Sequence, residues 1–222
     1  MIQSKILRQT MLVATALVLS VGPAGAQQFS FGILGGGSAT SGFSNETFAS
    51  TVPGPTGTVF TTSSSDAGDY LVGAAVEVRL PKQLSIEADG IYRPLNFRSF
   101  NSSITPGSGT APSNTVLTWE FPVLLKGRFV KVPALPGAEA FVEVGPSFRL
   151  ASNRNDTRPS NHGATGGLGI ETLLGPLGVS PALRYTRWGT DPVATMPYLP
   201  RTSPNQIEGV ISLCWHTFRR VK

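Results

Sequence analysis

Residues 69–93 constrain the fold more than any other stretch, because they alternate strictly between two chemical types. Apolar residues take every second position of 70–80, and charged or very small residues take most positions between. After the short connector 81–83, the same alternation continues over 84–93. A period of two is typical of β-strands, whose successive side chains point to opposite faces. The stretch therefore predicts a hairpin of two strands, each about ten residues long, as a membrane-spanning barrel requires.

The first 26 residues are predicted to be a cleavable signal peptide. Lys5 and Arg8 precede the apolar run 11–21, and an Ala-Gly-Ala sequence at 24–26 offers a cleavage site. The apolar run is too short to cross a bilayer as a helix of about 20 residues. The domain prediction is therefore a signal peptide over 1–26, a barrel over 27–218, and a basic C-terminal tail over 219–222.

Charge and cysteine content exclude some classes of protein. Two of the 18 Lys and Arg residues lie in the leader, so the mature chain keeps 16 basic residues. With 13 acidic residues, its net charge is only +3. No extended run of Lys and Arg is present, and we expect no nucleic-acid partner. The single cysteine, Cys214, cannot form an internal disulfide. Stability is therefore expected from a closed barrel, in which every backbone group is paired.

The mature chain is predicted to be all-β, because no segment keeps an apolar stripe with a period of 3.6 residues. Alternating runs indicate eight strands, the first over 29–43, and polar loops are predicted over 44–68 and 94–114. Pro122 lies inside the fourth strand, where its missing N–H predicts a bulge or a local weakness in pairing. The connections alternate long and short along the whole chain. This alternation predicts an eight-stranded antiparallel up-and-down transmembrane β-barrel, with short periplasmic turns and four long extracellular loops.

Composition indicates which face of this barrel is inside. Most acidic residues share one parity of the strands with arginines and with small residues such as Gly73 and Ser147, which a crowded lumen needs. The opposite face carries almost no charge in its central portions, and so large an apolar surface is not left in water. We therefore predict a lipid-facing apolar surface and a charge network in the lumen. The network comprises Glu77, Arg79, Glu87, Asp89, Arg93, Glu120, Glu143, Arg149, Glu171, Arg184 and Glu208.

Aromatic residues near the predicted strand ends are interpreted as two interfacial girdles, as membrane barrels carry at both bilayer surfaces. Aromatic residues are also common in strands of any kind, so they are ordinary β-formers on the alternative interpretation. The girdle residues are Tyr70, Tyr92, Trp119, Phe148 and Tyr185 on the loop side, and Phe129 and Trp215 on the turn side.

The leader, the strand number and the loop alternation resemble the small eight-stranded outer-membrane barrels of the OmpA-like and OmpX-like kind, within the outer-membrane β-barrel domain family. The resemblance covers residues 29–218 and includes no diagnostic motif. It implies a porin-like barrel in the outer membrane of a Gram-negative cell, in contact with lipid, lipopolysaccharide and the barrel assembly machinery. Family barrels usually end on an aromatic residue that this machinery reads. Here Phe218 is followed by four more residues and has the opposite parity to Trp215, so either is a candidate signal.

The predicted lumen charges are expected to pair, because an isolated buried charge is costly. The pairs either gate a narrow ion path or plug the lumen. Eight strands leave an interior just wide enough for side chains, which favours the plug and excludes sugar-sized solutes. In the predicted pairing, Glu77, Glu87, Glu120 and Glu143 are neutralised by Arg79, Arg93, Arg149 and Arg184.

We expect neither catalysis nor a metal or other cofactor. Some eight-stranded barrels modify lipid A with His and Ser, and the candidates here are His162 with Ser160 nearby and His216 with Cys214 nearby. Neither histidine has a clear carboxylate to orient it, although Glu208 shares the strand face of His216. No cluster of His, Cys and carboxylates has the spacing of metal ligands.

The predicted loops carry arginines that are candidates for contact with lipopolysaccharide phosphates or with an external partner. They are Arg98, Arg154, Arg158 and Arg201. Two classes of function remain open: a membrane-embedded barrel with a structural or surface-binding role, and a soluble exported β-barrel or sandwich that carries a small ligand. The sequence identifies no ligand and no loop partner.

Overall fold

The computed structural model describes residues 28–51, 58–65, 68–102, 113–133, 137–152, 159–190 and 201–216. The predicted signal peptide, the basic tail, Phe218 and two of the loop arginines, Arg154 and Arg158, lie outside these ranges. Cleavage of the leader, the domain bounds and the choice of assembly signal therefore stay predictions. In the described ranges, no helix is long and apolar enough to cross a membrane.

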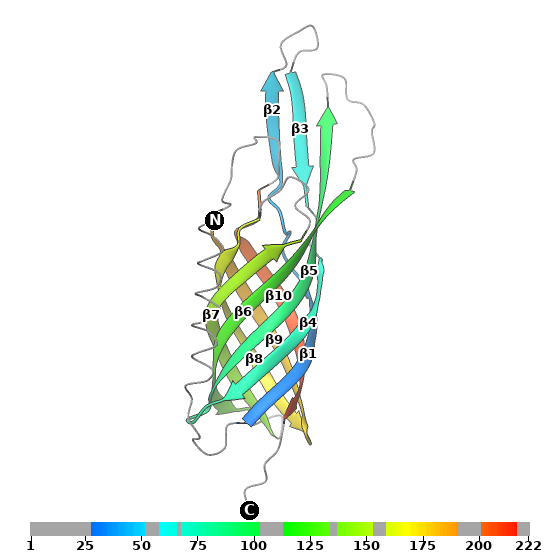
Figure 1. Ribbon diagram of the computed structural model, residues 1–222. Coiled ribbons are helices and arrows are strands. Elements are labelled where there is room, and N and C mark those ends of the chain that lie inside the picture. The colour runs from blue at the N-terminus through cyan, green and yellow to red at the C-terminus, as the bar shows by residue number, and fades with distance from the viewer. Residues whose placement is uncertain are drawn as a thin grey trace, which may run out of the picture. The chain divides into compact units, whose positions relative to one another are not determined.

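Ten strands make up the described chain, and every pairing between them is antiparallel (Figure 1). Eight of them form a closed ring in the order β5-β4-β1-β10-β9-β8-β7-β6, with β6 pairing back onto β5. The predicted closed eight-stranded antiparallel barrel is confirmed. The strands are β1 (Gln28–Ser38), β2 (Glu46–Thr51), β3 (Thr58–Ser64), β4 (Tyr70–Arg79), β5 (Leu84–Ser102), β6 (Ser113–Lys131), β7 (Ala138–Ala151), β8 (His162–Leu174), β9 (Leu177–Trp188) and β10 (Asn205–His216).

The three short connections join Arg79 to Leu84, Lys131 to Ala138 and Leu174 to Leu177, and these strand ends lie at one end of the barrel, which we call the turn end (Figure 1). The opposite end is called the loop end. In the first turn, Lys82 and Gln83 both have a φ of 63°, in the left-handed region that two-residue hairpin turns use. The Leu80 N–H donates to the Leu84 carbonyl across this turn at 2.8 Å. The hairpin expected from 69–93 is therefore present, with its connector where the sequence places it.

The chain departs from the sequence prediction beyond the loop end. The segment 44–68, predicted to be a loop, contains β2 and β3, and the segment 94–114 includes the outer parts of β5 and β6. The first strand ends at Ser38 and not at residue 43. β3 pairs with the outer part of β5 from Phe60↔Ser102 to Ser64↔Arg98. Thr, Val and Phe in β2 and β3 favour extended backbone, and this preference prevails over the surrounding Ser, Gly and Pro.

Pro122 weakens the ladder between β5 and β6 without shifting its register. The pairs Ala88↔Val123 and Ile91↔Glu120 follow one register, and the two intervening pairs are missing. This is the local weakness expected of a residue without a backbone N–H. The bulge lies elsewhere, between Arg128 and Val130 in the pairing of β6 with β7.

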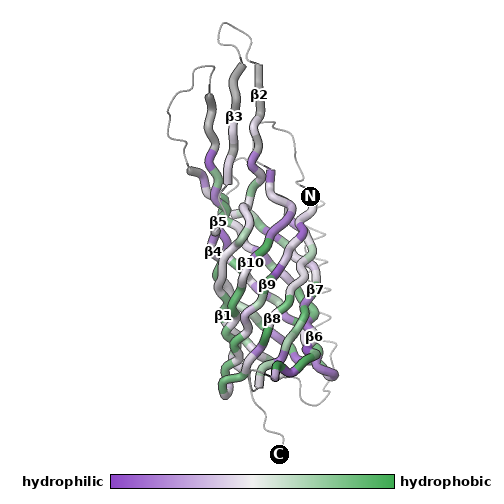
Figure 2. Tube along the Cα trace, turned by 180° about the vertical axis from the view of Figure 1, so that it is seen from behind, coloured by the Kyte–Doolittle hydropathy of each residue, from purple (hydrophilic) through white to green (hydrophobic). Residues whose placement is uncertain are grey.

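The barrel strands carry mostly apolar side chains on the outer face and mostly polar ones on the inner face, where Leu34, Leu71, Ile91 and Val210 are buried apolar exceptions. Figure 2 shows hydrophobic and hydrophilic residues following one another along these strands. Large outward-facing apolar residues from all eight barrel strands are between 37 % and 63 % exposed. On β7, for example, Val142 and Val144 are exposed, whereas Glu143 between them is buried. The exposed apolar surface of the barrel therefore lies outside, and most of the charges within its strands lie inside.

Candidate functional site

The lumen is the most distinctive site of the molecule, because the inner parity of the strands gathers the charges there. Ten of the eleven residues predicted for the lumen network are at most 5 % exposed, and the Arg79 side chain is 25 % exposed. All eleven take part in ion pairs. The ion pairs form three separate clusters, which follow one another from the loop end to the turn end.

The loop-end cluster joins two arginines to two glutamates. Arg149 contacts Glu120 at 2.9 Å, and Arg93 contacts Glu120 at 3.3 Å. Arg93 also donates to Glu208. Gln206 extends the cluster, since its amide donates to Glu208 at 3.0 Å and its carbonyl oxygen accepts from Arg149 at 2.8 Å. Two cations and two anions balance in this layer.

Trp188 packs against one side of the loop-end cluster. Its indole is 3 % exposed and its N–H donates to the carbonyl oxygen of Gln206 at 2.9 Å. The Arg149 guanidinium lies over the indole, 3.7 Å from its ring centroid. A cation held over a tryptophan face in a desolvated place is stabilised by the electrostatics of the ring. Trp188 therefore holds Arg149 in addition to Glu120 and Gln206.

The central cluster is built on Arg184 of β9. Its guanidinium donates to Glu143 at 2.6 Å, to Asp89 at 2.6 Å and to Glu87 at 2.8 Å. Lys126 of β6 contacts the second oxygen of Glu87 at 3.0 Å. Arg184 thus links strands from opposite parts of the ring through three carboxylates, while only two cations serve these three anions.

The turn-end cluster holds two arginines and two glutamates. Arg128 donates to Glu77, to Glu171 at 2.6 Å and to the Ser85 hydroxyl at 3.0 Å. Arg79 contacts Glu171 at 2.5 Å and lies 4.0 Å from Glu77. Arg79 is the most exposed member, at the opening of the lumen on this side. The cluster is electrically balanced, as is the cluster at the loop end.

Each of the four glutamates of the predicted pairing contacts at least one of the four predicted arginines, but these arginines also pair with acids outside that set. Arg79 lies closer to Glu171 than to Glu77, and Arg184 serves Asp89 as well as glutamates. The prediction also omitted four members: Lys126, Arg128, Trp188 and Gln206. Each shares the inward parity of its strand, so a strict period-two count extended to the strand ends includes them.

A buried apolar group lies beyond Arg93 towards the loop end, with two members on β5, one on β6 and one, Phe43, outside the barrel strands. Phe43, Leu95, Phe97 and Val116 are each at most 4 % exposed, and the rings of Phe43 and Phe97 meet edge to face at 5.0 Å. We call these four residues the mouth cluster. Two segments outside the barrel strands hold it: Phe43 bridges to Thr202, and backbone hydrogen bonds link Ser44 to Arg201 and Ser203 to Gly42.

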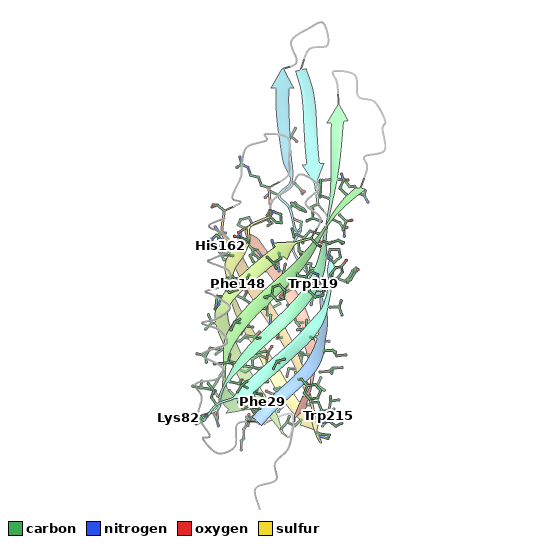
Figure 3. All side chains as sticks on the ribbon, in the orientation of Figure 1. Phe29, Lys82, Trp119, Phe148, His162 and Trp215 are labelled. Atoms are coloured by element: carbon green, nitrogen blue, oxygen red, sulfur yellow. The ribbon has the colours of Figure 1, made fainter. Side chains whose placement is uncertain are left out.

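The predicted girdle residues all lie on the outer face of the barrel. Tyr92 is partly buried and meets Trp119 edge to face, with ring centroids 5.6 Å apart. The other six are exposed. Figure 3 shows Trp119 and Phe148 towards the loop end and Trp215 near the turn end.

Exposed arginines occur around the loop end. Arg187 of β9 points outward next to Tyr185, and both donate to the amide oxygen of Asn205. Of the predicted loop arginines, Arg98 and Arg201 are exposed. Arg187 was not predicted, because it continues a strand and not a loop.

His162 is not arranged as a general base. Its Nδ1 contacts the amide oxygen of Asn161 at 2.9 Å, and the Ser160 hydroxyl donates to the backbone carbonyl of His162 at 3.1 Å. A base of the Ser-His-acid type is instead oriented by a carboxylate and contacts the hydroxyl it activates. The side chain of the other candidate, His216, is outside the described side chains. In the described part of the chain, no group of three His, Cys, Asp or Glu could hold a metal ion.

The fold and the site define a closed eight-stranded barrel with an apolar exterior and ion-paired lumen. Two solved structures similar to the chain are the outer membrane protein OprG from Pseudomonas aeruginosa (13 % identity, 87 % of this chain and 97 % of that one, TM-score 0.48) and Neisserial surface protein A (11 %, 86 % and 96 %, TM-score 0.44). A third is the translocator domain of the autotransporter NalP from Neisseria meningitidis (12 %, 97 % and 98 %, TM-score 0.32). No family model and no curated protein matches the sequence.

Proposed function

We propose that the chain is an integral outer-membrane β-barrel with a lumen filled by side chains, and that its role is structural or surface-binding. The observation that carries the proposal is the division between the two faces of the barrel. Apolar residues such as Ile33, Val144 and Leu168 are each more than 60 % exposed on the outer face, while the charges face inward. A bilayer covers such a surface, whereas water does not.

The closed ladder supports the membrane location. Hydrocarbon offers no hydrogen-bond partners, so a strand structure survives there only when the sheet closes on itself and leaves no edge. The eight-strand ring meets this requirement. A soluble exported barrel, the alternative, is disfavoured because it places its polar residues outside and its apolar residues inside.

The filled lumen supports a role other than transport. Three ion-pair clusters occupy its length, and the mouth cluster adds buried apolar side chains towards the loop end. Each cluster member is held by at least one charged partner, so a passing solute would have to break buried ion pairs, at several kcal/mol each. The proposed lumen is therefore a plug, and the proposed surface activity belongs to the loop end.

The loop end has the charge to contact lipopolysaccharide phosphates. Arg98, Arg187 and Arg201 are exposed there, and a guanidinium binds phosphate with paired N–H donors. Arg187 lies beside Tyr185, one of the interfacial aromatics. We propose these arginines as the lipid-phosphate contacts of the surface. Catalysis is not part of the proposal, since His162 is bonded to an amide and not to a carboxylate.

Membrane fractionation of the full chain, expressed in a Gram-negative host, tests the proposal. We expect the mature protein in the outer membrane, with a mobility on unheated detergent gels that changes on boiling, because a closed barrel resists unfolding by detergent. In planar bilayers the purified protein is expected to show negligible conductance. Recovery in the soluble periplasmic fraction would overturn the membrane location, and steady conductance would overturn the plug.

A further inference from the structure

The central cluster of the lumen has one more negative charge than its partners can neutralise. Glu87, Asp89 and Glu143 face two cations, Arg184 and Lys126. The loop-end and turn-end clusters each hold two anions and two cations. The surplus therefore belongs to the central cluster, where burial makes an uncompensated charge most costly.

One atom of the same cluster lacks a hydrogen-bond partner. Asp89 is 5 % exposed, its Oδ2 accepts from Arg184 at 2.6 Å, and its Oδ1 is buried with no partner among the described residues. An ionised carboxylate buried without a donor at one oxygen loses the hydration of that oxygen and gains nothing in return. The charge count thus identifies the central cluster, and the hydrogen-bond count identifies Asp89 within it.

We propose that Asp89 binds a proton on Oδ1 in the folded barrel at neutral pH. The proton removes the surplus negative charge of the central cluster, and Oδ2 still accepts from Arg184. A metal ion in its place would need several oxygen ligands, but Oδ1 is the one buried carboxylate oxygen in the three clusters that is without a partner among the described residues. The ligand of the site is therefore a proton. The inference goes beyond the proposed surface role and does not depend on it.

In the described part of the chain, Arg184 is the one cation that contacts Asp89. Arg184 on β9, Glu87 on β5 and Glu143 on β7 act on it directly. Lys126 on β6 acts on both glutamates. β4 places the small residue Ala75 opposite Asp89. The remaining neighbouring groups are uncharged or acidic: Gly167 of β8 lies beside Glu143 and Arg184, while Glu77 of β4 and Cys214 of β10 interact with Glu87.

Infrared spectroscopy of the full-length mature protein, folded in lipid vesicles, tests the site directly. A protonated carboxyl absorbs at a higher frequency than a carboxylate does. We expect the wild-type spectrum at neutral pH to contain one such band, which Asp89→Asn removes and which disappears at alkaline pH while the barrel stays folded. Absence of the band from the wild type would overturn the proposal. Persistence of the band in Asp89→Asn would place the proton on another carboxyl and would equally overturn it.

Urea unfolding provides a second readout that an ordinary structural carboxylate would not give. In the unfolded chain Asp89 is an ordinary, ionised aspartate at neutral pH. The folded state therefore binds one more proton, and stability falls as pH rises until that proton is lost. Asp89→Asn, which resembles the protonated acid, should lose this part of the pH dependence. Its urea midpoint at about pH 7 should therefore lie above that of the wild type, and the two midpoints should converge as the pH falls.

Glu208→Gln is the matched control, because it makes the same acid-to-amide change at an equally buried position in a balanced cluster. It leaves Arg93 short of a carboxylate, so we expect its urea midpoint to fall well below that of Asp89→Asn. If Asp89→Asn lowers the midpoint as much as Glu208→Gln does, Asp89 is ionised in the folded barrel and the proposal fails. Whether the protein fractionates with the outer membrane tests the proposed function. It does not test the proton on Asp89.

Discussion

The outer and inner faces of the barrel are built from the same strands but obey opposite rules. On β9, Leu183 is 53 % exposed, while its neighbour Arg184 is 2 % exposed and holds three carboxylates. One residue along the chain separates the proposed lipid from a buried ionic network. The difference teaches that position within the two-residue period, and not local hydrophobicity, decides what a substitution does here.

The faces also differ in how their parts depend on one another. Outer residues contribute area, so each is replaceable by another apolar residue of similar size. Inner residues contribute charge, and a buried charge is tolerated only with its partners. A change on the outer face should therefore act alone, whereas a change in the lumen should leave several partners unsatisfied.

The largest effect is expected from Arg184→Ala. Among the described residues, this change leaves Lys126 as the one cation in the cluster of Glu87, Asp89 and Glu143. Removal of one partner from a buried ionic group costs about 3–5 kcal/mol. Urea unfolding in vesicles should show a loss of this size, and planar-bilayer conductance should stay negligible if the clusters serve as a plug. A rise in conductance would instead show that the clusters gate an ion path.

Arg187→Ala is the control for this variant, on the same strand but on the outer face. Arg187 is exposed and donates to Asn205, so the change should cost within about 0.5 kcal/mol. Equal losses for the two variants would mean that Arg184 is not buried in a network, and the contrast between the faces would be refuted.

A second comparison uses the depth of the apolar face on β7. Val144 and Leu150 are each 61 % exposed on the same face, but Val144 lies in the middle of the strand and Leu150 near its loop end. A cation at the bilayer midplane costs about 2–4 kcal/mol, and one near the interface costs about 0–1 kcal/mol. Val144→Arg should therefore reduce stability and assembly, whereas Leu150→Arg should assemble nearly as the wild type does.

The outcome of this pair is read from folded and unfolded bands on detergent gels and from urea midpoints. If both variants behave alike, the exposed apolar face does not lie across a bilayer, because in water two equally exposed positions should respond equally. This result would favour the soluble alternative.

The smallest expected effect comes from tryptophan replacements on the two faces. Trp188→Phe removes the indole N–H that Gln206 accepts, and loss of one such bond costs about 1 kcal/mol. Trp119→Phe changes an outward ring that is 43 % exposed, and its cost should be smaller. The difference between the urea midpoints of the two variants measures the difference between these two costs. A larger loss for Trp119→Phe would mean that the inward bond has no energetic role.

Much of the barrel is predictable from the sequence because the period-two signal is repeated on every strand. The turn at 81–83 and the inward parity of Glu77, Arg184 and Glu208 depend only on this local alternation. Closure of the sheet is also predictable. An apolar exterior indicates strands in hydrocarbon, where the backbone groups of an open sheet edge would have no hydrogen-bond partners.

The pairing of the charges is not predictable in this way. Arg79 meets Glu171 from the far side of the lumen, and such contacts depend on register and on side-chain reach across the ring. The mouth cluster is not predictable from the sequence for a similar reason. Phe43 lies in a polar stretch, and its place in the interior depends on its backbone bridge to Thr202, which is far away in the sequence. β2 and β3 were missed because Ser, Gly and Pro dominate the composition around them.

The three tryptophans test the central claim most directly, because the barrel places two outside and one inside. Trp119 and Trp215 are 43 % and 51 % exposed on the outer face, and Trp188 is 3 % exposed in the lumen. Variants that keep one tryptophan each, with Phe at the other two positions, can be folded in vesicles of brominated lipid, which quenches the fluorescence of tryptophans that touch its chains. We predict strong quenching of Trp119 and Trp215 and little quenching of Trp188. Quenching of Trp188 as strong as that of the other two, or no quenching of Trp119 and Trp215, would contradict an apolar exterior in lipid around a sealed, charged lumen.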